Sequence, residues 1–165
     1  MIVVLFGVSG VGKSSIGKLL AQELGWRFHD ADDFHPAANI EKMRAGVPLT
    51  DADREPWLDS LRDLVKECVA ADENTVLACS VLKRAYRDHL RVNADVKFVY
   101  LRGDAELVAT RLEQRTDHYM DPALLASQLD DLEEPGPDEP AVTIDAAMTP
   151  AAIVKDARET LGLAH

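Results

Sequence analysis

The amino-acid sequence predicts an α/β fold in which a parallel β-sheet is flanked by helices on both faces. Five short apolar runs alternate along the chain with longer stretches of helical periodicity. Several of these runs are apolar at nearly every position, which is typical of parallel strands buried on both faces. Parallel strands need crossover connections, and the intervening helices supply them. The length of 165 residues suits one domain, and the sequence contains no internal repeat or low-complexity linker.

Each expected element has its own signal. The strands are expected at Ile2–Phe6, Arg27–Asp30, Thr75–Cys79, Val96–Leu101 and Ala141–Asp145. Amphipathic stripes mark helices, one with Ile16, Leu19, Leu20 and Leu24, a second with Trp57, Leu58, Leu61, Leu64, Val65 and Cys68, and a third with Leu125, Leu129 and Leu132. The last helix is expected to begin at Pro150, with Thr149 as its N-cap. The acidic, proline-containing run 130–140 is expected to be a solvated loop.

Composition excludes several classes of function. The formal net charge of −11 repels nucleic acid and anionic lipid, so neither is an expected partner. No apolar run approaches the roughly 18 residues of a membrane span, and the apolar run 2–6 is too short for a signal peptide. Cys68 and Cys79 lie in apolar segments, which suggests free thiols in a reduced, cytoplasmic protein.

A phosphate-binding loop follows the first expected strand. Residues 7–14 read G-V-S-G-V-G-K-S and match the P-loop pattern G-x-x-x-x-G-K-[ST]. The glycines allow backbone N–H groups to point into one concavity, and the helix that begins near Lys13 adds the positive end of its dipole. Lys13 is expected to reach the β- and γ-phosphates of ATP, and the Ser14 hydroxyl to bind Mg²⁺. The residues expected to bind ATP are Gly7, Ser9, Gly10, Val11, Gly12, Lys13, Ser14, Ser15 and Arg111.

Two carboxylates follow the second expected strand. Asp30 and Asp32 alternate onto one side if that strand continues, and ligands of parallel sheets lie at the carboxyl ends of the strands. One carboxylate can hold Mg²⁺ through water, and the other can orient or deprotonate an attacking hydroxyl. The alternative is a solvated acidic turn. The spacing alone does not assign the two roles.

A basic lid is expected near residues 114–122. Arg111 and Arg115 are four residues apart, on one face of a helix expected to end near Thr116. Arg115 can close over the phosphates and neutralise the charge that develops during transfer, whereas the alternative is an exposed basic helix face. The guanine-reading Asn-Lys-x-Asp segment of GTPases does not occur. A small P-loop protein of this kind is more often a kinase of nucleotides or metabolites.

Residues 30–58 resemble a known family. They read D-A-D-D-F-H-P-A-A-N-I-E-K-M-R-A-G-V-P-L-T-D-A-D-R-E-P-W-L and are similar to the D-x-D-x-[FL]-H-P-x-x-N-x-x-K-M-x-x-G-x-P-L-x-D-x-D-R-x-P-W-L segment of small P-loop gluconokinases. Residues 79–91, C-S-V-L-K-R-A-Y-R-D-H-L-R, and residues 127–135, S-Q-L-D-D-L-E-E-P, are similar to two further stretches of that family. The departures are small: Ala31 stands where Gly is frequent, and Tyr119 where Phe is usual.

The resemblance implies a fold, a reaction and a set of roles. The fold is that of nucleoside monophosphate kinases, a P-loop kinase fold with a five-stranded parallel sheet and a small mobile lid. The reaction converts ATP and D-gluconate into ADP and 6-phosphogluconate, which feeds the pentose phosphate or Entner–Doudoroff route, and the family suggests a homodimer. The implied roles are catalysis by Lys13, Asp32 and Arg115, Mg²⁺ binding by Ser14 and Asp30, and substrate binding by Asp32, His35, Arg54, Lys83 and Arg87, within a substrate-binding segment of about residues 32–58.

Physical chemistry supports part of this assignment and leaves alternatives open. A gluconate carboxylate favours a bidentate partner, which Arg54 or Arg87 can supply better than a lysine. Lys83, Arg87 and Arg91 recur every four residues, which equally fits a solvated helix face. Trp57 and Phe34 fit the core as well as a substrate contact. His35 fits a structural hydrogen bond in a turn as well as a substrate contact.

Two other functions remain open from the sequence. One is another small-metabolite kinase of the same fold, such as an enzyme similar to shikimate kinase. The other is a nucleotide-binding regulatory protein without transfer activity. An acceptor-side carboxylate favours transfer, because nucleotide binding alone does not need one.

Overall fold

The computed structural model describes residues 1–114 and 122–163 of the chain. Within these residues, five strands form one sheet in the order β2-β3-β1-β4-β5, and each neighbouring pair is parallel. The expected α/β fold is therefore confirmed, and each expected strand matches within one residue at either end. The strands are β1 (Ile2–Phe6), β2 (Arg27–Asp30), β3 (Thr75–Ala78), β4 (Val96–Arg102) and β5 (Ala141–Asp145).

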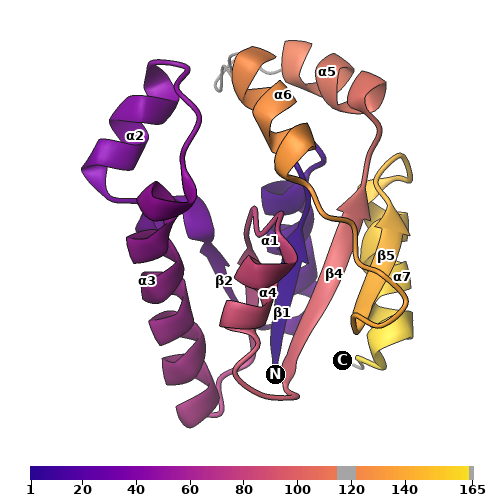
Figure 1. Cartoon of the computed structure of the whole chain (residues 1–165). Helices are drawn as coiled ribbons and strands as arrows, with labels where there is room; N and C mark the ends of the chain where they lie inside the picture. Colours follow the sequence, from indigo (N-terminus) through magenta and orange to yellow (C-terminus); the bar gives the residue numbers. More distant parts are fainter. Residues whose placement is uncertain (115–121, 164–165) are drawn as a thin grey trace.

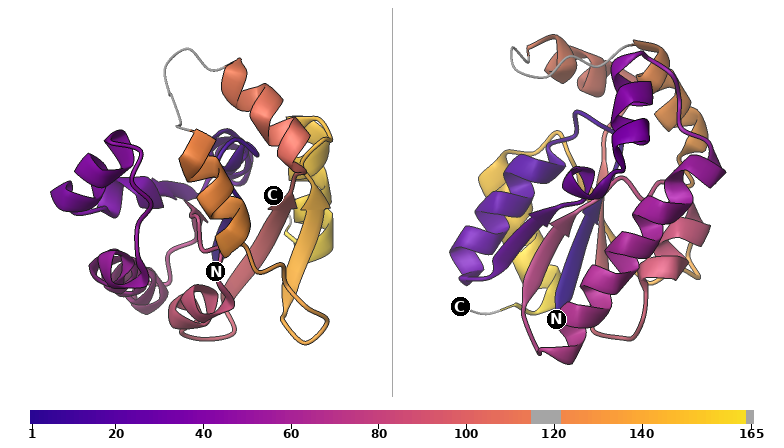
Figure 2. Two further views of the ribbon diagram at one scale, coloured as in Figure 1. Left: turned by 45° about the horizontal axis from the view of Figure 1, so that its top comes forward. Right: turned by 90° about the vertical axis from the view of Figure 1, so that its left-hand side faces the viewer.

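Helices cover both faces of the sheet, as Figure 1 and the right-hand view of Figure 2 show. Helices α3 and α4 cover one face, and α1 and α7 cover the other, while α2, α5 and α6 lie above the carboxyl ends of the strands (Figure 1). None of the described helices is long and apolar enough to cross a membrane. The helices are α1 (Lys13–Leu24), α2 (Ala37–Arg44), α3 (Asp51–Ala70), α4 (Arg84–Leu90), α5 (Ala105–Glu113), α6 (Pro122–Asp131) and α7 (Pro150–Leu161), with a 3-10 turn η1 at Ala31–Phe34.

The core has two layers because side chains alternate along each buried strand. In β1, Val4 and Phe6 pack toward α3 and α4, whereas Val3 and Leu5 pack toward α1 and α7. All five residues of β1 are buried, which explains the continuous apolar run in the sequence. The sheet thus forms a rigid support whose carboxyl edge carries the functional residues.

Local signals in the sequence set the ends of two helices beside this edge. Thr50 and Asp53 form a reciprocal capping box at the start of α3, with a 3.1 Å bond from the Asp53 N–H and a 2.9 Å bond from the Thr50 N–H. Thr149 accepts a 3.2 Å bond from the N–H of Ala152, and Pro150 begins α7 as expected.

The acidic connection between α6 and β5 differs in part from the expectation of a solvated loop. Glu139 is buried, and its carboxylate binds Arg87. Glu134 accepts a 3.1 Å hydrogen bond from the Tyr100 hydroxyl, and burial, followed by the charge of Glu134, raises the pKa of Tyr100 to about 12. The expectation of a solvated loop holds for most of the run, whose exposed residues include Glu133, Pro137 and Asp138. It fails at Glu139, because a run of carboxylates does not reveal which of them an arginine of the fold binds.

Candidate active site

The P-loop connects β1 to α1 at the carboxyl edge of the sheet. Gly7 approaches β4 so closely that an added Cβ would lie 2.7 Å from the carbonyl oxygen of Leu101. Gly12, which caps α1, has φ = 100°, a left-handed value that favours glycine. Lys13 donates a 3.1 Å bond to the carbonyl oxygen of Val8, so its ammonium group lies against the loop itself.

Arg111 also contacts the P-loop. Its Nη1 donates to the carbonyl oxygen of Val11 at 2.9 Å, and its Nη2 donates to that of Ala146 at 2.6 Å. A cation is thus anchored beside the phosphate loop, as expected for a residue near ATP. Its predicted contact with the nucleotide stays a prediction.

Ser14 and Asp30 are brought together at the ends of α1 and β2. The Ser14 hydroxyl donates a 2.6 Å bond to Oδ2 of Asp30. The other carboxylate oxygen of Asp30 accepts the N–H of Asp32 at 3.0 Å and caps η1. Two hard oxygen ligands therefore lie side by side next to the P-loop, and this donor set suits Mg²⁺. No cluster of three or more metal-binding His, Cys, Asp or Glu side chains occurs among residues 1–114 and 122–163.

A cavity of about 250 Å³ lies next to these residues. Its size suits a small metabolite rather than a macromolecule. Its walls come from the P-loop, η1, α2, α3, the loop after β3, and α6. Lining residues are Ser9, Asp32, His35, Ile40, Met43, Arg44, Pro48, Leu49, Arg54, Trp57, Ser80, Leu82, Leu124, Ser127 and Gln128. Among the predicted substrate ligands, Asp32, His35 and Arg54 are brought together here.

His35 is held as a neutral ring. It stacks on Trp57 with ring centroids 4.4 Å apart and planes 10° apart. Burial, followed by the charge of Arg54, lowers the pKa of His35 from 6.5 to about 4. Asn39 Nδ2 donates to the carbonyl oxygen of Asp53 at 2.8 Å and faces His35 Nδ1 at 3.2 Å. Nδ1 must accept this bond, so Nε2 carries the proton and the ring can donate to a hydroxyl.

Arg54 is held in place by two partners. Its Nη1 donates to the hydroxyl of Tyr86 at 3.0 Å, and its Nη2 pairs with Asp131 at 3.0 Å. The same Tyr86 hydroxyl donates to Asp51. Lys83 pairs with Asp51 at 2.9 Å and lies outside the lining of the cavity. Lys83 would therefore have to leave Asp51 or reach the substrate from outside the cavity lining, and its predicted substrate contact stays a prediction.

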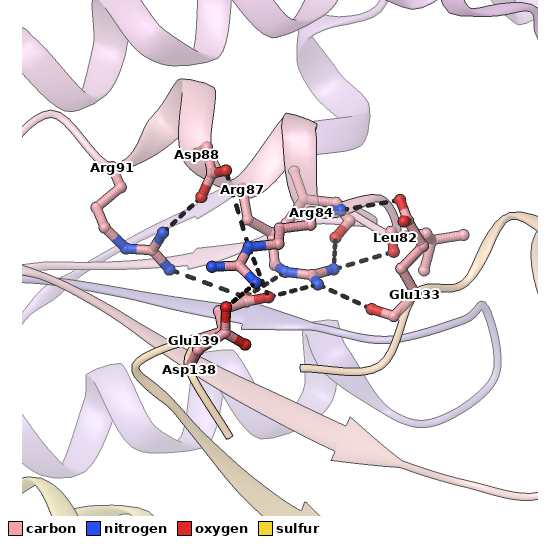
Figure 3. Close-up of polar contacts among 9 residues, drawn as sticks. Leu82, Arg84, Arg87, Asp88, Arg91, Glu133, Asp138 and Glu139 are labelled. Atoms are coloured by element: carbon pink, nitrogen blue, oxygen red, sulfur yellow. Dashed lines mark hydrogen bonds and ion pairs between the residues drawn. The ribbon is translucent and has the colours of Figure 1, made fainter. Parts of the chain in front are cut away.

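The structure corrects the role predicted for Arg87. This side chain is 0% exposed, lies outside the cavity lining, and forms an ion pair with Glu139 at 2.6 Å (Figure 3). The expectation that Arg87 binds the substrate is wrong, because each of its N–H groups is used inside the protein. The alternative of a solvated helix face is also wrong for this residue.

Other predicted residues have mixed outcomes. Trp57 serves the core and the cavity together, since it is 2% exposed, donates to the carbonyl oxygen of Ala31 at 2.7 Å and lines the cavity. Phe34 is partly buried against the core and does not line the cavity. Lys42, which lies within the substrate-binding segment 32–58, pairs with Asp53 at 2.8 Å. Arg115 lies outside the described residues, as does the lid apart from Gln114 and Pro122.

Sequence reasoning missed three side chains of this site. Asn39 sets the tautomer of His35, and its spacing of four residues from that histidine could have indicated a contact. Arg44 lines the cavity as a second cation at the end of α2. Gln128 accepts the backbone N–H of Ser9 at 2.7 Å and donates to its hydroxyl at 3.1 Å, which attaches α6 to the P-loop. No local signal in the sequence predicts this last contact.

Comparisons with known proteins show that the chain is similar to small-metabolite kinases. The family model described as shikimate kinase matches residues 9–160. The gluconokinase of Gluconobacter oxydans is 44% identical over 154 residues, which cover 93% of this chain and 86% of that protein. The crystal structure of a gluconokinase from Sinorhizobium meliloti has a TM-score of 0.86 and 43% identity, covering 97% of this chain and 90% of that one. The unliganded structure of a sugar kinase from Janibacter has a TM-score of 0.92 and 42% identity, covering 99% and 95%.

Proposed function

Because the chain belongs to the gluconokinase family, we propose that it transfers the γ-phosphoryl group of ATP to D-gluconate and forms 6-phospho-D-gluconate. The observation that carries this proposal is the extent of the similarity, which is 44% identity over 93% of the chain for the gluconokinase of Gluconobacter oxydans. The match to the shikimate kinase model supports the shared fold and leaves shikimate as the main competing acceptor.

At the phosphate side, we assign binding of ATP to the backbone of residues 7–15 together with Lys13. Lys13 would exchange its bond with the carbonyl oxygen of Val8 for phosphate oxygens, since a charged acceptor forms the stronger hydrogen bond. Ser14 and Asp30 would hold Mg²⁺, which neutralises phosphate charge when bound. The 2.6 Å contact between their oxygens supports this pairing.

At the acceptor side, we assign Asp32 to the attacking hydroxyl of gluconate. Asp32 lines the cavity, whereas Asp30 is not among its lining residues and binds the Ser14 hydroxyl. Phosphoryl transfer passes through a loose transition state, so the hydroxyl needs orientation more than early deprotonation. A carboxylate that accepts the hydroxyl proton in a hydrogen bond fixes the direction of attack and can take the proton late.

The remaining polar groups of the cavity suit a hydroxylated anion. Neutral His35 can donate from Nε2 to a hydroxyl of the sugar acid at physiological pH. Arg54 supplies a guanidinium for the carboxylate, and Arg44 also lines the cavity and offers a second cation. We retain Arg115 and the lid at residues 114–122 as the group that covers the phosphates during transfer.

We also propose a cytoplasmic, single-domain homodimer that binds neither nucleic acid nor membranes. Both cysteines, Cys68 and Cys79, are buried free thiols, and the net charge of −11 opposes binding to nucleic acid or anionic lipid. Light scattering on the purified protein measures the oligomeric state directly.

A coupled ADP-release assay tests the proposal. Gluconate, glucose, other sugar acids and shikimate are each supplied with ATP and Mg²⁺, and the Lys13→Ala protein serves as the control for contaminating kinases. We expect gluconate to support the highest kcat/KM. Glucose lacks the carboxylate, and losing a charged hydrogen-bonded pair typically costs about 2–5 kcal/mol. A higher kcat/KM with glucose or shikimate would refute the assignment.

A further inference from the structure

A buried ion pair lies behind one wall of the cavity, and the proposed reaction does not use it. The side chains of Arg87 and Glu139 are both 0% exposed. Their contact is bidentate, with Nε to Oε2 at 2.6 Å and Nη2 to Oε1 at 2.9 Å (Figure 3). Arg91 adds a second guanidinium 3.8 Å from the same carboxylate.

The Arg87 guanidinium joins α4 to two other segments of the chain. Its remaining N–H groups donate to the carbonyl oxygens of Val81 at 3.0 Å, Leu82 at 2.9 Å and Glu133 at 2.8 Å. All five of its N–H groups are therefore used. The N–H of Glu133 also donates to the carbonyl oxygen of Leu82 at 2.8 Å, so the loop after β3 is bonded to the chain that leaves α6.

Both joined segments contribute to the cavity. Ser80 and Leu82 line it from the loop after β3, and Ser127 and Gln128 line it from α6. Asp131, the last residue of α6, pairs with Arg54 at 3.0 Å. The Arg87–Glu139 pair thus holds the backbone that carries cavity residues from two different elements.

Stability alone is a weak explanation for this pair. Removing two charges from water is costly, and replacing a buried ion pair by apolar residues of similar volume is often neutral or stabilising. The five N–H donors of an arginine, however, form a rigid fork that a lysine cannot reproduce. The geometry is therefore suited to selecting one backbone arrangement.

We propose that Arg87 and Glu139 are positioning residues for the acceptor: they fix the loop 80–82 against the end of α6 and so set the shape of the cavity that binds gluconate. Neither side chain lines the cavity, so both act through the backbone that they hold. The guanidinium forms no hydrogen bond to the P-loop. Gln128, which joins α6 to Ser9, lies about one helical turn before the end of α6, so the KM for ATP should change less than the KM for gluconate. This inference rests on the proposed function.

The paired variant Arg87→Met/Glu139→Leu separates positioning from stability. It leaves no charge of the pair buried alone, but three carbonyl oxygens lose their donor, so the thermal midpoint should fall and the KM is measured on protein shown to be folded. The carbonyl oxygens of Val81, Leu82 and Glu133 lose their donor, so the loop and the end of α6 can shift. The KM for gluconate should therefore rise by about tenfold. This change is smaller than the ~10²-fold loss of rate that a 1 Å misplacement in an active site can cause. The KM for ATP should change by less than about twofold. Arg87→Lys keeps the positive charge but loses the planar set of five N–H donors, so its KM for gluconate should also be higher than that of the wild type.

Two single variants keep the test decisive. Arg87→Lys keeps a cation against Glu139 and should therefore still fold if the paired variant does not, and its KM for gluconate should also rise. Val96→Ala truncates a buried side chain at the opposite end of the sheet, so it should lower the thermal midpoint without changing the KM for gluconate. A wild-type KM for gluconate in folded Arg87→Lys or in the folded paired variant would refute the inference. A wild-type protein without gluconate-dependent ADP release would instead refute the proposed function.

Discussion

The neutral state of His35 leads to a prediction about stability and pH. Burial and the charge of Arg54 lower its pKa in the folded protein to about 4, from 6.5 in the unfolded chain. Between these values the unfolded chain binds a proton that the native protein does not bind. The free energy of unfolding must therefore fall as the pH is lowered through this window. Between pH 7.5 and pH 5.0 the full shift corresponds to about 2 kcal/mol, because one pKa unit corresponds to about 1.36 kcal/mol. The ring is only partly buried, so solvent screening should reduce the observed loss to about 1 kcal/mol.

Urea unfolding at these two pH values, followed by circular dichroism, measures the loss. His35→Asn is the matched variant, because its side-chain oxygen can still accept the bond from Asn39 but cannot titrate. The difference between the two proteins removes the contributions of other groups. The pKa of Asp53, lowered to about 2 chiefly by its hydrogen bond from Lys42, matters only below about pH 4. An equal loss of stability in wild type and His35→Asn would refute the argument.

Three predictions concern the phosphoryl-transfer machinery. Lys13→Ala should abolish transfer without changing the circular dichroism spectrum, and near-normal turnover would contradict the role of the P-loop. Asp32→Asn should lower kcat by about 10²–10⁴-fold and leave the KM for ATP almost unchanged, whereas Asp30→Asn should mainly weaken Mg²⁺–ATP binding. If Asp32→Asn mainly weakens Mg²⁺–ATP binding and Asp30→Asn mainly lowers kcat, the roles of the two carboxylates are exchanged. If kcat falls by only a few fold in both variants, neither carboxylate acts as the acid–base group. Arg115→Ala should lower kcat more than it raises the KM for ATP, because its charge acts mostly in the transition state, and a normal kcat would make it a binding residue only.

The strands and the phosphate loop could be predicted because their signals are local. A strand buried on both faces must be apolar throughout, as Ile2–Phe6 is, and its ends then follow within a residue. The P-loop is one contiguous pattern. The juxtaposition of Ser14 and Asp30 follows from the rule that the carboxyl ends of parallel strands share one edge.

The role of Arg87 could not be predicted because its partner is distant in the sequence. Glu139 is 52 residues away, and helical periodicity describes the face of α4 without naming the segment that packs on it. The contact between Ser9 and Gln128, which are 119 residues apart, is of the same kind. The tautomer of His35 also depends on an amide held by Asp53 through the tertiary fold. Such long-range polar contacts are set by packing rather than by pattern.

The central claim is that gluconate is the acceptor, and a competition reaction tests it most directly. Equal concentrations of gluconate and shikimate are incubated with the wild-type protein, ATP and Mg²⁺, and the products are followed by phosphorus NMR. Because both acceptors share one enzyme, the ratio of initial product rates equals the ratio of their kcat/KM values. We predict that 6-phosphogluconate is the dominant phosphomonoester formed. Dominant formation of shikimate phosphate, or ADP and inorganic phosphate without a phosphorylated acceptor, would contradict the claim.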